Sequence, residues 1–535
     1  MTQKQNYLHG AAVLTAGVIV MKILGAIYKI PLYNIMGTDG FTYYNVAYDL
    51  YNVLLTVSTA GFPVAMSRMV SEANSLERPA QVRRIFRISL VTFFILGSIG
   101  TLVMLLFPTE LATMMNRVRS AQSIFALAPS VVLVCVLSAY RGYIQGHSYM
   151  TPTSISQVIE VAVKVLVGLV LVVTGSRAGR SVPELAALAI FGVPAGSLAS
   201  CLYIVYKKHG FDREQTKPLS TPDVPDSGTM VFRQLVKIGI PISIGSMVVS
   251  VITLLDTSLT LNRLVNAAGL LEERVDQLFG VYKAVVTLYN IPAAFITTLT
   301  ISVVPAIAAA LARRKLSQAQ EISESSLRIA TILALPMGVG LSALAHPVTY
   351  GLFSDMTPEG PKMMLIMGFA SYFVCMSLVS NAILQAGGAE KLPIISMTVG
   401  GIIKVSVNWI LVADPKINIL GAPVGTLCCY IVMCVINYFF IVWRFSGGVK
   451  LSKILPRPAI SSAVMGVAAW GVYTLAANFF GSELSRTRLL LAMCMGIGVG
   501  IAVYLVMIIV TRAVTAEDLK LIPKGDKLAK LLKIS

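Results

Sequence analysis

The sequence has few charged residues and very few histidines. Of its 535 residues, 13% are charged and four are histidine, whereas a soluble protein carries roughly 25% charged residues. So few histidines argue against a multi-histidine metal site. All seven cysteines lie in apolar stretches, without metal-ligand spacing to a histidine. We therefore expect no metal centre, no resident cofactor and no disulfide, and the composition excludes an ordinary soluble domain.

Apolar residues fill most of the chain. Hydrophobic residues make up 56% of it, and the mean hydropathy is +0.77. Runs of about 20 or more apolar residues recur along the whole length, which predicts an all-α polytopic membrane protein. We predict about 14 spans, at residues 9–36, 41–70, 86–107, 120–146, 152–175, 184–207, 233–262, 277–311, 324–350, 361–387, 392–413, 418–444, 456–480 and 487–511.

Basic residues greatly outnumber acidic ones, 43 to 25, giving a net charge of +18. The even-numbered loops and the tail carry many more of them than the odd-numbered loops do, so the positive-inside rule predicts a multi-pass protein of the bacterial plasma membrane with both termini in the cytoplasm. This placement explains the charge without a nucleic-acid partner. The basic residues in question include Arg78, Arg83, Arg84, Arg141, Lys207, Lys208, Arg213, Lys217, Arg313, Arg314, Lys315, Lys391, Lys450 and Lys453. In the tail they are Lys520, Lys524, Lys527, Lys530 and Lys533.

Matching motifs recur in the same order in the two halves of the chain. Gly192-Val-Pro-Ala-Gly196 matches Gly421-Ala-Pro-Val-Gly425, and Lys164 matches Lys404. We therefore predict two six-helix lobes with a pseudo-twofold repeat, followed by two further helices. The predicted divisions are an N-lobe at 1–207, a cytoplasmic linker at 208–232, a C-lobe at 233–444, and spans 13–14 with a basic tail at 445–535.

The first predicted span carries two lysines, Lys22 and Lys29. A lysine near the centre of a membrane helix costs about 2.5–3.5 kcal/mol, and a spacing of seven places both on one helix face. Such residues usually line a water-filled cavity, where they would attract an anionic cargo. Lys22 could instead extend to the membrane interface or pair with a carboxylate.

Further charged residues lie within the predicted spans, and each has two interpretations. Arg68 is either a cargo contact or an interfacial anchor. Asp49 could neutralise a lysine of the first span, and Glu160 could pair with Lys164 four residues later. Lys404 is a candidate cavity residue.

Asp256 and Lys283 lie in the seventh and eighth predicted spans. They could pair with each other, or Asp256 could bind a coupling cation while Lys283 contacts a phosphate. The tyrosines Tyr43, Tyr44, Tyr48 and Tyr51 are more typical of packing or of an interface belt than of a sugar-binding platform.

Several segments resemble a known transporter family. GAIYKIPLYNIMG, STAGFPVAMSRMVSEA, YRGYIQG, GVYKAVVTLYNIPAAF and SVVPAIAAALARR are similar to the stage V sporulation protein B-type polysaccharide flippases. These belong with the MurJ-type lipid II flippases in the multidrug/oligosaccharidyl-lipid/polysaccharide exporter superfamily. The resemblance implies two lobes around a cationic cavity and a groove for a lipid tail beside the last two helices. It places functional basic residues at or near Lys22, Lys29, Arg68 and Lys283, and an acidic one at Asp39.

The function that follows is transport without covalent chemistry. We expect a monomeric flippase that moves an undecaprenyl-diphosphate-linked saccharide, first of all lipid II for peptidoglycan synthesis, from the inner to the outer leaflet. It would work by alternating access, with candidate hinges at Pro63 and Pro305. The membrane potential, Na⁺ or H⁺ would couple the step, and Asp39, Asp49, Asp256, Glu160 and Lys164 are the gating or coupling candidates. A cation-coupled multidrug antiporter is the alternative. A membrane enzyme is disfavoured because no catalytic cluster lies in a loop.

Overall fold

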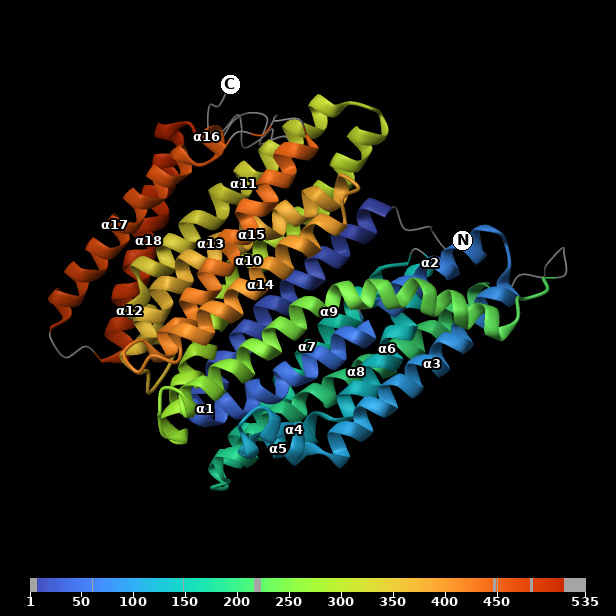
Figure 1. Cartoon of the computed structure of the whole chain (residues 1–535), viewed down its shortest axis with the longest axis horizontal. Coiled ribbons are helices and arrows are strands. Elements are labelled where there is room, and N and C mark those ends of the chain that lie inside the picture. The colour runs from blue at the N-terminus through green and yellow to red at the C-terminus, as the bar shows by residue number, and fades with distance from the viewer. Residues whose placement is uncertain are drawn as a thin grey trace. The chain divides into compact units, whose positions relative to one another are not determined.

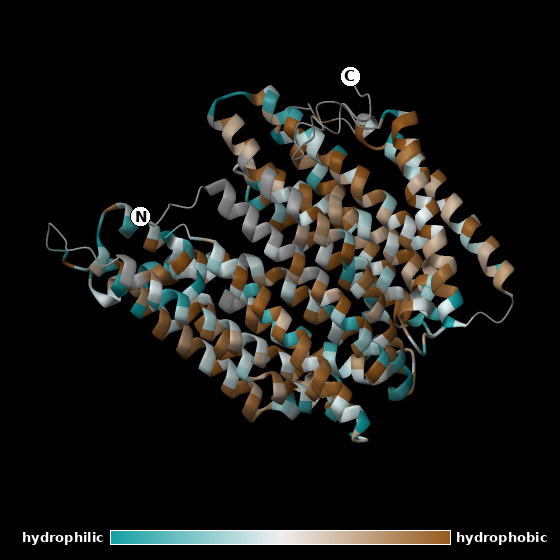
Figure 2. Cartoon of the chain, turned by 180° about the vertical axis from the view of Figure 1, so that it is seen from behind, coloured by the Kyte–Doolittle hydropathy of each residue, from teal (hydrophilic) through white to brown (hydrophobic). Residues whose placement is uncertain are grey.

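The computed structural model describes residues 7–59, 61–147, 149–215, 223–445, 449, 451–481 and 485–513. Every regular element in these ranges is helical, and 13 helical segments are long and apolar enough to cross a membrane. Figure 2 shows the hydrophobic residues spread along the lengths of the helices. The prediction of an all-α polytopic membrane protein is confirmed.

Helix α1 (Tyr7–Thr59) contains the first predicted span and much of the second. Its backbone breaks at Gly37, where φ is 71° and ψ is −176°, a conformation open essentially to glycine alone. The rings of Tyr33 and Phe41 are 5.4 Å apart, although eight residues of straight helix would separate them by about 12 Å. The chain therefore folds back at Gly37, as Figure 1 shows beside the α1 label, and one continuous element supplies two predicted spans.

The first compact unit comprises residues 1–262. Its helices are α1, α2 (Gly61–Ser75), α3 (Pro79–Leu106), α4 (Pro108–Met114), α5 (Ala121–Leu127), α6 (Pro129–Gly146), α7 (Thr151–Arg177), α8 (Val182–Gln215) and most of α9 (Gly228–Asn266), with a 3-10 turn η1 (Val118–Ser120). The predicted span 120–146 is confirmed as one candidate membrane span, Val118–Gly146. Within it the chain divides into α5 and α6, because Pro129 begins a new helix.

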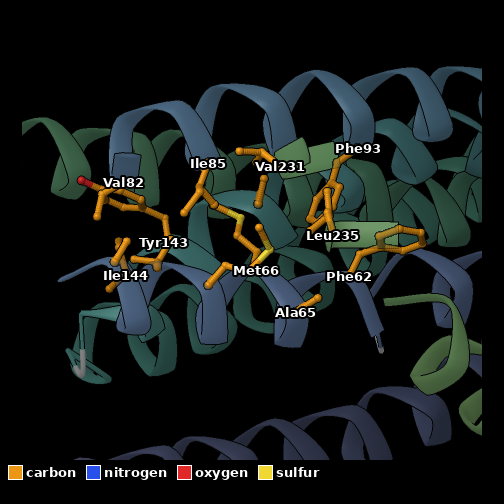
Figure 3. Packing of buried hydrophobic residues seen from close by; sticks show 14 of the residues in the cluster. Phe62, Ala65, Met66, Val82, Ile85, Phe93, Tyr143, Ile144, Val231 and Leu235 are labelled. Carbon is orange, nitrogen blue, oxygen red and sulfur yellow. The ribbon is translucent and has the colours of Figure 1, made fainter. Parts of the chain in front are cut away.

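An apolar cluster joins five helices of this unit, α2, α3, α6, α8 and α9 (Figure 3). Phe62 and Met66 of α2 meet Phe93 of α3, with the Phe62 and Phe93 rings edge to face at 5.8 Å. Val231 and Leu235 of α9 belong to the same cluster and are fully buried. The beginning of α9 is therefore packed into the first unit, although the sequence places it in the second half.

The polar linker predicted at 208–232 is shorter than expected. Helix α8 continues to Gln215, and α9 begins at Gly228. Of the residues between them, the structure describes 223–227, where Asp223 and Asp226 bind the beginning of α3 through Arg78 and Gln81. This part of the linker is therefore held by specific polar contacts.

The second compact unit comprises residues 263–535. Its helices are α10 (Glu272–Ala312), α11 (Leu316–Ala343), α12 (Ala345–Leu352), α13 (Glu359–Ala386), α14 (Lys391–Leu411), α15 (Gly421–Arg444), α16 (Leu451–Ile454), α17 (Pro456–Phe480) and α18 (Arg486–Thr511), with a 3-10 turn η2 (Asn418–Leu420). Helix α13 packs against α10, α11 and α15, and α17 pairs with α18 and contacts α11. The division into lobes at residues 207 and 233 stays a prediction.

Candidate functional site

Lys164 of α7 lies against tyrosine side chains from both legs of α1. Its Nζ is 4.7 Å from the ring centroid of Tyr48 and 5.9 Å from that of Tyr28, and it donates a 3.4 Å hydrogen bond to the Tyr48 hydroxyl. The Tyr28 hydroxyl donates to the Ala189 carbonyl of α8 at 2.9 Å, which fixes that ring in place. Aromatic faces stabilise an ammonium group without neutralising it, so this lysine keeps a positive charge able to attract an anion.

Three tyrosines of α1, Tyr44, Tyr48 and Tyr51, form a row of neighbouring rings. The Tyr44 and Tyr48 rings are 5.9 Å apart and nearly parallel, and Tyr51 follows at another 5.9 Å. Tyr43, Tyr44 and Tyr51 are buried, with at most 2% of each residue exposed. These three tyrosines are packing residues, which is one of the two roles that the sequence analysis favoured over a sugar-binding platform. Tyr48 is only partly buried and contacts Lys164.

Glu160 does not form the predicted local pair with Lys164. Its Oε2 instead accepts a 2.8 Å hydrogen bond from Nη2 of Arg141, which lies on α6. The two side chains are 23% and 14% exposed respectively. The i,i+4 interpretation was wrong because Arg141 reaches Glu160 from a neighbouring helix, while the Lys164 ammonium donates to the Tyr48 hydroxyl.

Three serines complete the polar cluster around this ion pair. Arg141 Nε donates to Ser156 Oγ at 2.9 Å, and its Nη2 also reaches Ser200 Oγ at 3.1 Å. Ser197 Oγ donates to Glu160 Oε1 at 3.3 Å. The sequence analysis treated Arg141 as a loop residue and missed these serines. The sequence did contain an indication of this polar cluster, because Ser156 and Glu160 are four residues apart and therefore lie on one helix face.

Glycines of the repeated motif let α8 approach α7 closely enough to build this site. A side chain at Gly192 would overlap the Lys164 carbonyl. The matching Gly425 of α15 lies against the Asn408 side chain of α14, and a Cβ there would come 3.3 Å from the Lys404 carbonyl. The repeated motif therefore packs its helix beside a lysine-bearing helix in each unit.

Two buried carboxylates lie on α1 and α9 of the first unit. Asp49 is 8% exposed, and its Oδ2 accepts a 2.7 Å hydrogen bond from the Thr257 hydroxyl. Asp256, beside Thr257, is 4% exposed. A second contact between the same helices joins the hydroxyls of Thr56 and Ser250 at 2.6 Å. The pairing of Asp49 with a lysine of the first span, and of Asp256 with Lys283, stay predictions.

The remaining predicted residues have varied surroundings. Arg68 is exposed on α2, whereas Lys283 is 7% exposed, with Nζ 5.1 Å from the Phe279 ring centroid. Lys29 and Lys404 are partly buried. Asp39 accepts a hydrogen bond from the Thr38 hydroxyl at 3.2 Å, next to the Gly37 turn.

Some predictions fall outside the described part of the chain. They concern the side chain of Lys22 and the basic tail beyond residue 513.

Comparison with known proteins identifies the family. Residues 7–311 match the model of the family described as polysaccharide biosynthesis protein. The chain belongs to this family. It is also 25% identical to the lipid II flippase MurJ of Bacillus subtilis, over 86% of this chain and 87% of MurJ. Stage V sporulation protein B of the same organism is 24% identical over 85% of each chain, and the uncharacterised membrane protein YabM is 26% identical over 98% and 96%.

Solved transporter structures share the fold. An inward-facing multidrug resistance MATE family transporter of the MOP superfamily aligns with a TM-score of 0.66 at 14% identity, covering 82% of this chain and 98% of the other. An outward-facing transporter of the same family aligns with a TM-score of 0.59 at 14% identity, over 83% and 97%. The predicted family and fold are confirmed, and relatives that carry a named activity are transporters or flippases rather than enzymes, as predicted.

Proposed function

We propose that this member of the polysaccharide biosynthesis protein family is a flippase for an undecaprenyl-diphosphate-linked saccharide, with lipid II as the first substrate to test. The observation that supports it most is the environment of Lys164, an ammonium group held by tyrosines inside the helical unit. A diphosphate headgroup needs compensating cations to leave water. Lys29 of the same unit is a further candidate contact for the phosphates, as are Lys283 and Lys404 of the second unit.

The lipid tail can stay in the bilayer while the headgroup crosses. With the cell interior negative, outward movement of each negative charge gains about 2.3 kcal/mol per 100 mV. The membrane potential therefore supplies part of the driving force for outward movement of the headgroup. Binding of Na⁺ or H⁺ would return the carrier to its starting state. The protein acts as a monomer in the plasma membrane, with the two halves exposing the headgroup site alternately to each side.

The test is transport by the full-length protein in proteoliposomes, comparing lipid II with other polyprenyl-diphosphate-linked glycans. Replacing Lys164 with Gln removes a charge-assisted contact of about 1.5–3 kcal/mol, so transport should fall by about tenfold or more. Lys164→Arg should retain part of the activity. Arg177→Gln, which removes a positive charge from the last turn of the same helix, is the matched control. Full activity of Lys164→Gln would contradict the cargo role.

A second variant addresses the first span. Lys29→Ala should abolish complementation of a flippase-depleted cell, while Lys29→Arg should restore most of it. Normal growth with the alanine variant would remove Lys29 from the site. Orientation is tested by cysteines placed at Ser220 and Thr357, which should label from inside and outside respectively.

A cation-coupled multidrug antiporter remains the second candidate, because Asp49 and Asp256 are buried carboxylates of the kind that bind cations. The same liposomes distinguish the two functions. Efflux of a cationic dye driven by a Na⁺ or H⁺ gradient, lost in Asp49→Asn or Asp256→Asn and accompanied by no lipid II transport, would favour the antiporter.

A further inference from the structure

A pocket of about 500 Å³ lies in the first unit, between α5 and the α7–α8 turn. Its lining includes Thr174, which is ten residues beyond Lys164 on α7, or about 15 Å of helix. The pocket is therefore separate from the lysine–tyrosine cluster, and the proposed transport function does not use it. A volume of this size is typical of small-molecule sites.

Most of the residues that line the pocket are apolar. Leu171 lies on α7, and Leu188 and Phe191 lie on α8. Phe191 is 47% exposed, and α7 as a whole buries little of its apolar length. Because these helices belong to membrane-spanning segments, the exposed side of the pocket meets hydrocarbon, where an acyl chain can lie against it.

The mouth of the pocket carries one positive and one negative side chain. Arg180 Nη1 and Glu184 Oε1 are 3.8 Å apart, and the side chains are 61% and 40% exposed. This distance is too long for a hydrogen bond, so both groups keep hydrogen-bonding capacity for a ligand. The Ser181 backbone N–H donates to Glu184 Oε2 at 3.0 Å, which holds that carboxylate at the beginning of α8.

We propose that this pocket binds the headgroup of a zwitterionic phospholipid with a primary ammonium, such as phosphatidylethanolamine. The lipid phosphate would accept hydrogen bonds from the Arg180 guanidinium, and the ammonium would donate to the Glu184 carboxylate. Its acyl chains would lie along Leu188 and Phe191. An anionic headgroup would place a net negative charge beside Glu184, and a quaternary ammonium has no N–H to donate to it.

The test uses a photo-crosslinking amino acid at Leu188 in the full-length protein, reconstituted in nanodiscs with equal parts of phosphatidylethanolamine, phosphatidylcholine and phosphatidylglycerol. Mass spectrometry then identifies the lipid adducts. Because exposed charge pairs contribute weakly, phosphatidylethanolamine adducts should exceed each of the others by about threefold. Adducts in proportion to the lipids supplied, or no lipid adducts, would overturn the proposal.

Two variants test the charge assignment. Glu184→Gln should shift the adducts toward phosphatidylglycerol, since Arg180 then faces the headgroup alone. The exchange Arg180→Glu with Glu184→Arg keeps both charges and should keep the preference. Arg177→Gln, in the same turn but outside the pocket, should leave the ratios unchanged. An unchanged ratio in Glu184→Gln would refute the role of the carboxylate. Lipid II transport by the same variants, measured in proteoliposomes, reports separately on the proposed function.

Discussion

The contact between the linker and α3 gives a quantitative prediction. Helix α3 has Arg78 at its N-cap position, which makes no side-chain capping hydrogen bond, because a guanidinium has no acceptor atom. Asp223, which is distant in the sequence, supplies the acceptor that caps the helix instead. Its Oδ2 accepts the Gln81 backbone N–H at 3.0 Å, and its Oδ1 accepts Arg78 Nε at 3.2 Å. The carboxylate thus caps α3 and lies at the positive end of its dipole.

Asp226 strengthens the same contact. It exchanges two hydrogen bonds with Gln81, one from its own backbone N–H to Oε1 at 2.7 Å and one from Gln81 Nε2 to its Oδ2 at 2.9 Å. Arg78 Nη2 also donates to the Val224 carbonyl at 2.8 Å. The linker is therefore joined to α3 through side chains and backbone on both partners, and removing Asp223 should loosen both segments together.

We expect Asp223→Ala to destabilise the first turn of α3 by about 1–2 kcal/mol, the usual cost of losing a helix N-cap acceptor. Asp223 is 4% exposed on its side chain, so water replaces the lost acceptor poorly. Hydrogen–deuterium exchange at the Gln81 amide should then accelerate by about 5–30-fold, together with amides at the beginning of α9. Glu72→Gln, which removes one exposed carboxylate from α2, is the matched control.

The same contact has a defined dependence on pH. Hydrogen bonds from the Gln81 and Ala80 backbone and from Arg78 lower the pKa of Asp223 below its ordinary 3.8, although burial opposes this. A carboxyl whose pKa is lower in the folded state stabilises the protein above the unfolded pKa, and the contribution is lost as pH falls through the folded pKa. Protection of α3 should thus be constant from neutral pH to about pH 5 and fall only below about pH 4. Unchanged exchange in Asp223→Ala, with the linker still protected, would refute the capping argument.

Two further predictions concern the first unit. The half-buried pair of Arg141 and Glu160 should show a coupling of about 1–3 kcal/mol in a double-mutant cycle of Arg141→Ala and Glu160→Gln, measured by denaturant unfolding in detergent; additive effects would mean that the pair contributes little. Gly37→Ala should cost about 1–3 kcal/mol, because alanine is strained at the positive φ of the α1 turn; an unchanged melting temperature would show that the turn relaxes freely.

The sequence was sufficient for the features that depend on local chemistry. The apolar runs at 9–36 and 41–70 predict two spans, and the two legs of α1 lie there on either side of Gly37. The partner of Glu160 was missed because the i,i+4 rule considers one helix at a time, whereas Arg141 reaches it from α6. The acceptor that caps α3 was missed for the same reason: Asp223 is more than 140 residues away in the chain.

These contacts also decide which buried charges can serve an anionic cargo. Two cations lie close together at α7. Arg141 binds Glu160 of this helix, and Lys164 lies on the same helix one turn further along. The guanidinium of Arg141 is balanced by a carboxylate at 2.8 Å, so this pair adds little net charge to its surroundings. Lys164 rests on the Tyr48 face and hydroxyl, which stabilise the ammonium without cancelling it. Arg141 thus pairs with Glu160 while Lys164 lies against Tyr48, and we infer that the two cations have complementary roles: one holds the helices together, and the other supplies positive charge.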